Sequence, residues 1–410
     1  RIVVFEVSGI INLESELKIT YPYITIAGQT SPGGILITGY QTTVNTHDVI
    51  IQHMRFRVGS HRIANGADPE TLDSFDIAGK YWAESEAYNI IIDHSSFSWG
   101  VDETVTISGG VTNTTIQWSI ISEGLSHAGH PKGEHSKGLL ISGKYVYPNT
   151  ISMHHNYIAH NSDRVPEIGS PVGVDTIVDV VNNVAYDWKG GLSPGGEGSA
   201  KINWKHNYAK KGINSNSYSF EVIHTPNAQS VSAQLYVEGN IGSTRLSQSD
   251  PQWNVGFEWR NIPLSKEWRK MSPWSTPPVT TTEMSYSYAL NVLNSVGATK
   301  PVRDSVDTRV IADFANGTGT IIDNVVYPTD FPTFQNLSVS TDSDSDGMPD
   351  TWETSKGLNP NLSSDRNNIV SSGVYQDYTY IEYYLGELAG IVSSTPDTTP
   401  PAAPTELTVN

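Results

Sequence analysis

The chain has 410 residues and no cysteine, which excludes a disulfide framework, a thiolate nucleophile and a thiolate metal site. Its 25 Lys and Arg residues stand against 43 Asp and Glu residues, and the net charge of −18 argues against nucleic acid or an anionic membrane as partner. No apolar run is long enough to span a bilayer. We expect a monomer whose N-terminal cap and secretion signal precede Arg1.

Short β-branched runs ending near Asn, His or Asp recur along the first three quarters of the chain. Ile91 and Ile116 are 25 residues apart, and Asn183 and Asn207 are 24 apart. A repeat of this length indicates stacked units, with apolar residues inside and asparagine ladders at the corners. Residues 1–330 are therefore predicted to form an all-β fold, a right-handed parallel β-helix (solenoid). A sandwich or propeller is disfavoured because its strands would recur every ~8–12 residues.

The same pattern makes predictions about the later part of this domain. No segment before residue 330 has a sustained helical period, so we expect no long helix there, and residues 321–325 resemble a late strand of the repeat. Residues 243–300 interrupt the rhythm and are predicted to pack on the solenoid. Their tryptophans are expected to cover a coil rather than to stack on sugars: Trp253, Trp259, Trp268 and Trp274.

The C-terminal part changes in composition. Residues 331–393 are predicted to form a small calcium-binding module with a helical stretch over Tyr375–Leu388, and the proline-rich residues 394–410 a linker to a further domain. Six residues, with Gly347 at the sixth position, have the spacing of an EF-hand-like calcium loop. The five acidic members of this structural calcium site are Asp342, Asp344, Asp346, Asp350 and Glu353.

Three segments in the predicted solenoid contain polar residues in an unusual arrangement. They are residues 73–77, the Ile-Asp-His and Trp-Gly-Val-Asp-Glu motifs in residues 92–103, and the His-His-Asn-Tyr and Arg-Val-Pro motifs in residues 154–166. Together these motifs resemble family 1 polysaccharide lyases, the pectate lyases, over residues 20–215. The resemblance implies a secreted enzyme that binds Ca²⁺ and cleaves polygalacturonate, the backbone of pectin, by β-elimination.

The resemblance also implies a calcium site formed by residues of neighbouring coils. Asp73 and Asp102 match the calcium-binding carboxylates, whereas Thr106 stands where many relatives have another Asp. Glu103 or Asp76 would compensate for that ligand, or calcium would bind together with the carboxylate of the substrate.

Two basic residues match the catalytic positions. Lys137 corresponds to a lysine that contacts the uronate carboxylate, with His135 assigned to the same substrate site, and Arg164 corresponds to the catalytic base. The second arginine of the family is Gly169 here. Five lysines of the following coils are candidates to replace it, of which Lys189 and Lys205 are assigned to substrate binding: Lys189, Lys201, Lys205, Lys210 and Lys211.

This chemistry has a physical basis that does not depend on the family. The proton on C5 of a uronate is weakly acidic, and a divalent cation and a lysine at the carboxylate stabilise the charge that develops when it leaves. Arginine is an unusual base because its guanidinium has a pKa above ~12. Adjacent cations and desolvation disfavour a charged guanidinium, so we expect an alkaline optimum.

Other interpretations remain open at this stage. Asp93 and His94 suit a structural turn, and Arg164 suits a surface ion pair with Asp163 or Glu167. His127, His130 and His135 suit either a transition-metal site or a wall of the groove. The alternative functions are a β-helix pectin hydrolase with paired carboxylates and a non-catalytic polysaccharide-binding β-helix.

Overall fold

The computed structural model describes residues 1–80, 86–143, 149–170, 174, 176–190, 200–217, 219, 222–224, 234–258, 262–263, 265–335 and 337–390. The chain divides into two units, residues 1–336 and residues 337–410. The expected boundary after residue 330 lies close to this division. Trp259 and the predicted linker, residues 394–410, lie outside the described residues.

The first unit consists mainly of three parallel sheets, named here A, B and C. Sheet A contains β1 (Ile2–Val3), β4 (Ile24–Ala27), β7 (Val49–Gln52), β10 (Ala87–Asp93), β13 (Val111–Gln117), β16 (Asn149–His154), β19 (Thr176–Val181), β21 (Lys201–Lys205) and β24 (Gln234–Glu238). Sheet B contains β2 (Gly9–Asn12), β5 (Ile35–Thr38), β8 (Arg55–Arg57), β11 (Ser96–Ser98), β14 (Ile120–Ser122), β17 (Tyr157–Asn161), β20 (Val184–Trp188) and β22 (Tyr208–Lys210). Sheet C contains β3 (Leu17–Ile19), β6 (Thr42–Val44), β9 (Phe75–Ala78), β12 (Glu103–Gly109), β15 (Lys137–Gly143) and β18 (Glu167–Gly169).

Short elements complete this unit. The 3₁₀ turns are η1 (Gly28–Thr30), η2 (Ile63–Asn65), η3 (Pro69–Thr71), η4 (Gln252–Val255) and η5 (Lys266–Trp268). A small separate sheet contains β23 (Val222–His224), β25 (Gly256–Glu258) and β26 (Ile262–Pro263).

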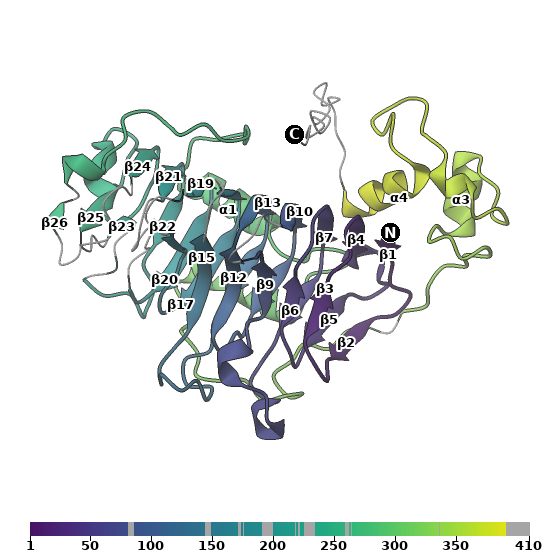
Figure 1. Ribbon diagram of the computed structural model, residues 1–410, viewed down its shortest axis with the longest axis horizontal. Helices are drawn as coiled ribbons and strands as arrows, with labels where there is room; N and C mark the ends of the chain where they lie inside the picture. The colour runs from purple at the N-terminus through teal and green to yellow at the C-terminus, as the bar shows by residue number, and fades with distance from the viewer. Residues whose placement is uncertain are drawn as a thin grey trace, which may run out of the picture. The chain divides into compact units, whose positions relative to one another are not determined.

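Successive coils of the chain contribute one strand to each of the three main sheets, and the coils follow one another along the long axis in Figure 1. Equivalent residues therefore stack: Ile92 lies in register with Ile51 on one side and Ile116 on the other, and all three are fully buried. This arrangement confirms the predicted parallel β-helix, because each β-branched run of the repeat occupies the same place in its coil.

An asparagine ladder marks the turn between sheets A and B. The backbone N–H groups of Asn156, Asn183 and Asn207 each donate to the side-chain oxygen of the next asparagine at 2.9 Å, and Asn240 ends the row. These side chains are almost completely buried. The expectation of corner ladders is thus confirmed, and the ladder satisfies polar groups that burial would otherwise leave unpaired.

The expectation of strands rather than helices before residue 330 is wrong at two places. Helices α1 (Tyr286–Ser295) and α2 (Ser305–Asn316) begin at the N-caps Ser285 and Asp304, whose side chains accept backbone hydrogen bonds. Their apolar faces pack on the outer face of sheet B, where Val310 and Phe314 join Ile120, Tyr157 and Tyr186 in one buried cluster. Each helix is so short that its period is weak in the sequence.

The assignment of residues 321–325 to a late strand is also wrong. These residues form no strand, and the carbonyl groups of Ile322 and Asp323 instead accept hydrogen bonds from the backbone of Ser126 and His127 at 2.9 and 3.0 Å. The segment therefore runs beside a loop of an earlier coil. The loop satisfies these two carbonyl groups, which need a hydrogen-bond partner when no neighbouring strand supplies one.

The tryptophan-rich segment packs on the last coils where the structure describes it. Trp253 contacts the main apolar core, and the backbone N–H of Trp274 donates to the side chain of Asn203 at 2.9 Å. Lys201 and Lys270 lie over the Trp274 ring, 4.9 and 4.3 Å from its centre. For Trp253 and Trp274, these contacts support the expectation that the tryptophans cover a coil.

The second unit contains α3 (Asp350–Lys356), η6 (Asp365–Asn367) and α4 (Tyr380–Ala389). The predicted helix over Tyr375–Leu388 begins five residues later, because Thr379 forms a capping box with Glu382. Glu387 of α4 accepts hydrogen bonds from Trp352 and Lys356 of α3 at 2.7 and 2.8 Å. In the described parts of both units, every helix is too short or too polar to cross a lipid bilayer.

Candidate active site

The polar residues singled out in the sequence lie where sheet B turns into sheet C. Asp73 precedes β9, Asp102 and Glu103 stand at the start of β12, Lys137 starts β15, and Arg164 lies between β17 and β18. Strands β9, β12, β15 and β18 are neighbours in sheet C. Glu103 is in register with Lys137, which in turn bridges to the residue before Arg164. Four consecutive coils therefore stack these residues in one row.

Three carboxylates of this row form a compact cluster. Asp73, Asp102 and Glu103 each offer an oxygen, and the three oxygens lie within 4.8 Å of one another. Burial, together with the charge of Asp102, raises the pKa of Asp73 to about 8. Buried like charges at this spacing repel each other, so the donor set and its electrostatics suit a divalent cation with oxygen ligands.

The replacement of an expected Asp by Thr106 has a clear structural setting. Thr106 lies in register with Asp76 of the neighbouring strand β9, and both side chains are largely buried. Burial raises the pKa of Asp76 well above its usual value, with Asp73 and Glu16 adding to the rise. Asp76 does not belong to the compact cluster, so Glu103 is the residue that supplies the third carboxylate.

Arg164 lies against the carboxylate cluster. Its guanidinium forms ion pairs with Glu103 and, from Nε at 2.9 Å, with Glu167. The backbone of Arg164 is left-handed (φ 59°), and its carbonyl accepts a hydrogen bond from Leu139 N at 2.6 Å. Gly138 permits this approach, because a Cβ there would lie 2.5 Å from the Arg164 carbonyl oxygen. The coil below therefore fixes Arg164 in place.

Lys137 is the next cation in the row. Its Nζ lies 3.0 Å from the carboxylate of Asp163, and its side chain is about one-fifth exposed. The backbone carbonyl of Lys137 accepts a hydrogen bond from Thr104 at 2.8 Å. The ammonium is therefore partly accessible. Its ion pair with Asp163, the residue before Arg164, keeps it close to that arginine.

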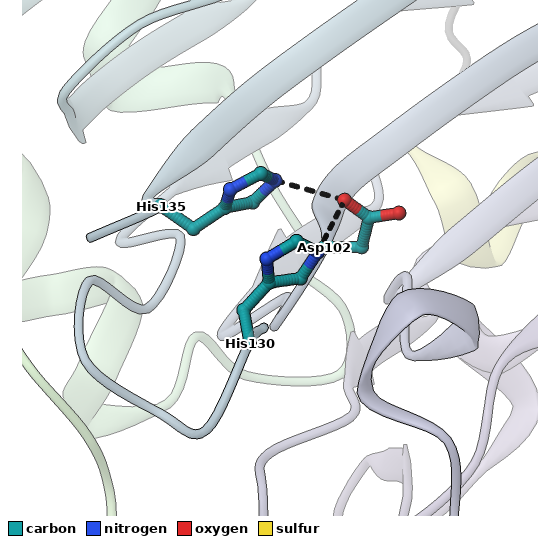
Figure 2. Close-up of side chains that lie close together, drawn as sticks. All are labelled: Asp102, His130 and His135. Atoms are coloured by element: carbon teal, nitrogen blue, oxygen red, sulfur yellow. Dashed lines mark hydrogen bonds and ion pairs between the residues drawn. The ribbon is translucent and has the colours of Figure 1, made fainter. Parts of the chain in front are cut away.

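Two of the three candidate histidines also converge on this cluster. Nε2 of His135 lies 2.8 Å from Oδ1 of Asp102, and Nε2 of His130 lies 3.3 Å from the same oxygen (Figure 2). Burial acts to raise the pKa of Asp102, but the hydrogen bond and charge of His135 outweigh it and lower that pKa. His127 points elsewhere, to the exposed Asp323 at 2.7 Å. The three histidines thus do not form one cluster, and His135 faces a carboxylate.

The lysines proposed to replace the second arginine lie on different faces of the coil. Lys189 forms an ion pair with Glu134, whereas Lys205 lies on sheet A, where it contacts Asp179 at 3.1 Å. Lys210 lies on sheet B. Lys205 and Lys210 therefore lie on other faces of the coil than Arg164. Lys189 directly follows β20, and the N–H of the next residue, Gly190, donates to the carbonyl of Ser162 on the coil of Arg164 at 2.7 Å.

Asp93 and His94 have a structural environment. Asp93 accepts hydrogen bonds from Gln52 and Gln117 of adjacent strands at 3.1 and 3.0 Å, and it lies 2.7 Å from Nδ1 of His94. These residues lie at the end of sheet A, which supports their interpretation as turn residues.

The second unit contains another group of carboxylates. Asp342, Asp344 and Asp346 offer oxygens within 4.8 Å of one another, as do Asp346, Glu353 and Asp365. Glu353 is fully buried, and neither of its carboxylate oxygens has a hydrogen-bond partner. Burial raises its pKa to about 7, with neighbouring acids adding to the rise. Orphaned buried oxygens of this kind suit a calcium ion.

The membership of this second group differs from the sequence pattern at two places. Asp350 uses its carboxylate to accept hydrogen bonds from the backbone and hydroxyl of Ser343 at 2.8 and 2.7 Å, and it belongs to neither group. Asp365 was missed. It enters from the loop after α3, and no spacing rule of the calcium loop includes a residue so far along the chain.

Proteins of similar sequence indicate the family of this chain. A protein of Aspergillus terreus named "Probable pectate lyase C" is 32% identical over 403 residues, covering 95% of this chain and 84% of its own. The chain belongs to the pectate lyase family. A pectate lyase C of Aspergillus fumigatus, also named as probable, is 30% identical over 402 residues, with 95% and 83% coverage.

Comparisons at lower similarity add little to this assignment. No family model matches the chain. Among solved structures, a pectate lyase from Paenibacillus sp. 0602 shares 16% identity and covers 72% of this chain and 79% of its own, with a TM-score of 0.41. The family assignment therefore rests on the sequence relatives, and this chain is accordingly a polysaccharide lyase.

Proposed function

We propose that this protein cleaves α-1,4-linked polygalacturonate by calcium-assisted β-elimination, giving unsaturated oligogalacturonides. The observation that carries the proposal is the row of three carboxylates, Lys137 and Arg164 at one corner of consecutive coils. Membership of the pectate lyase family supports the substrate class. We further propose that the enzyme acts outside the cell.

The cation site is assigned to Asp73, Asp102 and Glu103. Their oxygens lie within the distance that one ion spans, and carboxylates are ligands that calcium prefers. A calcium ion bound there would draw electron density from the uronate carboxylate and thereby acidify C5. Lys137 would exchange Asp163 for the same uronate carboxylate and add a second positive charge.

Arg164 is assigned as the base that removes the C5 proton. Glu103 and Glu167 orient its guanidinium, and the left-handed backbone limits its freedom. The C5–H electron pair forms the C4–C5 double bond, the C4–O bond breaks, and the leaving oxygen takes up a proton. The products are a new chain end with a free hydroxyl and a 4,5-unsaturated uronate. A base that is already held in position lowers the entropic cost of reaching the reactive geometry.

The proposal is tested by incubating the protein with polygalacturonate at alkaline pH, once with calcium and once with a chelator. The measurement is the ultraviolet absorbance of the unsaturated product. We expect absorbance to rise only with calcium. Arg164→Ala is expected to lower kcat by about 10²–10⁴-fold, the usual contribution of a general base. Asp102→Asn is expected to raise the calcium concentration needed for half-maximal rate.

Controls separate the roles of the two cationic positions. Lys137→Ala should raise KM and lower kcat, whereas Lys132→Ala, an exposed lysine of the preceding loop, should change neither. Full activity of folded Arg164→Ala would remove Arg164 as the base. New reducing ends without absorbance would instead indicate hydrolysis, and binding without either signal would indicate a polysaccharide-binding β-helix.

The second unit is assigned a structural calcium site. Asp342, Asp344, Asp346 and Glu353 supply the ligands that the loop spacing predicts, and Asp365 closes the site from the following loop. A chelator is expected to lower the melting temperature of this unit, because the buried carboxylates lose the ion that offsets their mutual repulsion.

A further inference from the structure

One oxygen of Asp102 is faced by two imidazole rings. Figure 2 shows that His130 and His135, both from the loop between β14 and β15, direct nitrogens toward the same carboxylate oxygen. The ligand atoms of the three residues lie within 4.8 Å of one another. The two rings are stacked, with centroids 3.8 Å apart and an interplanar angle of 16°. Of this group, Asp102 belongs to the proposed calcium site, whereas neither histidine is assigned to calcium binding or to proton removal.

One nitrogen of this group, Nε2 of His130, has no hydrogen-bond partner among the described residues. The His130 side chain is 1% exposed, and this nitrogen lies 3.3 Å from Oδ1 of Asp102. The same oxygen lies closer to Nε2 of His135, at 2.8 Å. An unsatisfied buried polar atom costs about 1–3 kcal/mol. A cation between the three atoms would remove this cost, since each would donate a lone pair to it.

The donor set indicates which kind of cation fits. Two imidazoles and one carboxylate favour first-row divalent transition ions, whereas calcium and magnesium prefer oxygen ligands. Three protein ligands also leave a coordination position open, as in many zinc sites. We propose that Asp102, His130 and His135 bind a divalent transition-metal ion such as Zn²⁺ beside the carboxylate cluster.

Binding requires one local rearrangement. A neutral imidazole that binds a metal through Nε2 carries its proton on Nδ1. Nδ1 of His130 now accepts a hydrogen bond from the backbone N–H of Lys132 at 3.2 Å. That contact must open, so the backbone around Lys132 is expected to shift when the ion binds.

Asp102 belongs to both this site and the carboxylate cluster of Asp73 and Glu103. An ion held by the histidines draws the shared carboxylate toward them and weakens the calcium site. By linkage, calcium weakens transition-metal binding by the same factor. This competition rests on the proposed function of the carboxylate cluster, whereas the existence of the histidine site does not.

The test is a titration of the whole protein with Co²⁺, followed by its visible absorption, and with Zn²⁺, followed by calorimetry, in the absence of substrate. We expect one ion per chain at this site. His130→Ala and His135→Ala should each weaken binding by more than the ~10–100-fold that loss of an outer-shell partner costs. The matched control is His127→Ala, from the same loop but directed to Asp323, and it should bind normally.

A conservative variant guards against loss of folding. His130→Gln keeps a similar volume and a polar group, and it should retain the circular dichroism of the parent protein while losing the cobalt spectrum. Absence of a stoichiometric ion in the parent protein would overturn the proposal, as would equal loss in His127→Ala. Tight Zn²⁺ binding, combined with no lyase activity of the zinc-free protein in calcium, would support this site and reject the proposed function. Zn²⁺ affinity unchanged by calcium would overturn the competition.

Discussion

His160 provides a test of how charge burial stabilises the solenoid. It lies on β17, fully buried, with Nδ1 2.8 Å from Asp187 and Nε2 3.4 Å from Asp313 of α2. Burial acts to lower the pKa of His160, but the interactions with Asp187 and Asp313 outweigh it and raise the pKa to about 9. The charged imidazole therefore ties helix α2 to the coil four residues before Arg164.

The sign and size of the effect follow from this shift. A folded-state pKa of about 9 lies above the ordinary value of 6.5, so the stabilisation is fully present below pH 6.5 and is lost as the pH rises through 9. At about 1.36 kcal/mol per pKa unit, the shift corresponds to roughly 3 kcal/mol. An alkaline working range would therefore coincide with the loss of this contribution.

Urea unfolding of the parent protein and of His160→Gln between pH 6 and pH 10, at fixed calcium, measures the effect. The variant should be less stable by roughly 3 kcal/mol or more at pH 6, and the difference should shrink by about that amount by pH 10. A difference that stays constant with pH would refute the reasoning, since loss of packing alone does not titrate. His127→Gln, at an exposed histidine, should show no such trend.

Three further changes test other parts of the structure. Gly169→Arg should lower KM for polygalacturonate several-fold, measured by initial rates, because a Cβ at Gly169 meets no heavy atom within 4 Å and the arginine adds a positive charge to the coil of Arg164. Asn183→Ala should destabilise the solenoid by about 2–4 kcal/mol in urea unfolding, because several buried ladder hydrogen bonds are lost. Glu353→Gln should reduce the calcium-dependent rise in melting temperature of the second unit while leaving lyase turnover unchanged.

The repeat allowed most of the solenoid to be predicted. Ile92 and Asn183 each have an equivalent residue at the same place in a neighbouring coil, Ile116 and Asn207. A period of about 25 residues in the sequence therefore becomes a stack in space. Helices α1 and α2 escaped prediction because they occur once, and their apolar faces match the outside of sheet B rather than an internal repeat. The local period of a sequence does not reveal that a helix packs on the outer face of a sheet.

The residues of the candidate site that belong to the regular coils could be predicted from the sequence. Asp73, Asp102 and Lys137 were identified from motifs, and the structure brings them to one corner. The partner of His135 was not predictable, because its loop departs from the repeat before it returns to β15. Asp365 was missed for a similar reason, since only the folding of the loop after α3 brings it to Glu353.

The spacing of the coils explains why this corner suits a cation. Neighbouring parallel strands lie ~4.7–4.9 Å apart, and calcium binds oxygen at ~2.3–2.6 Å, so an ion between carboxylates of adjacent coils meets both at its preferred distance. Asp73 lies on the coil before Asp102 and Glu103, and one oxygen of each of these three residues lies within 4.8 Å of the others. Lys137 and Arg164 follow on the next two coils. A uronate bound at this corner would therefore have the cation site, the lysine and the arginine within reach from neighbouring coils, as the proposed elimination requires.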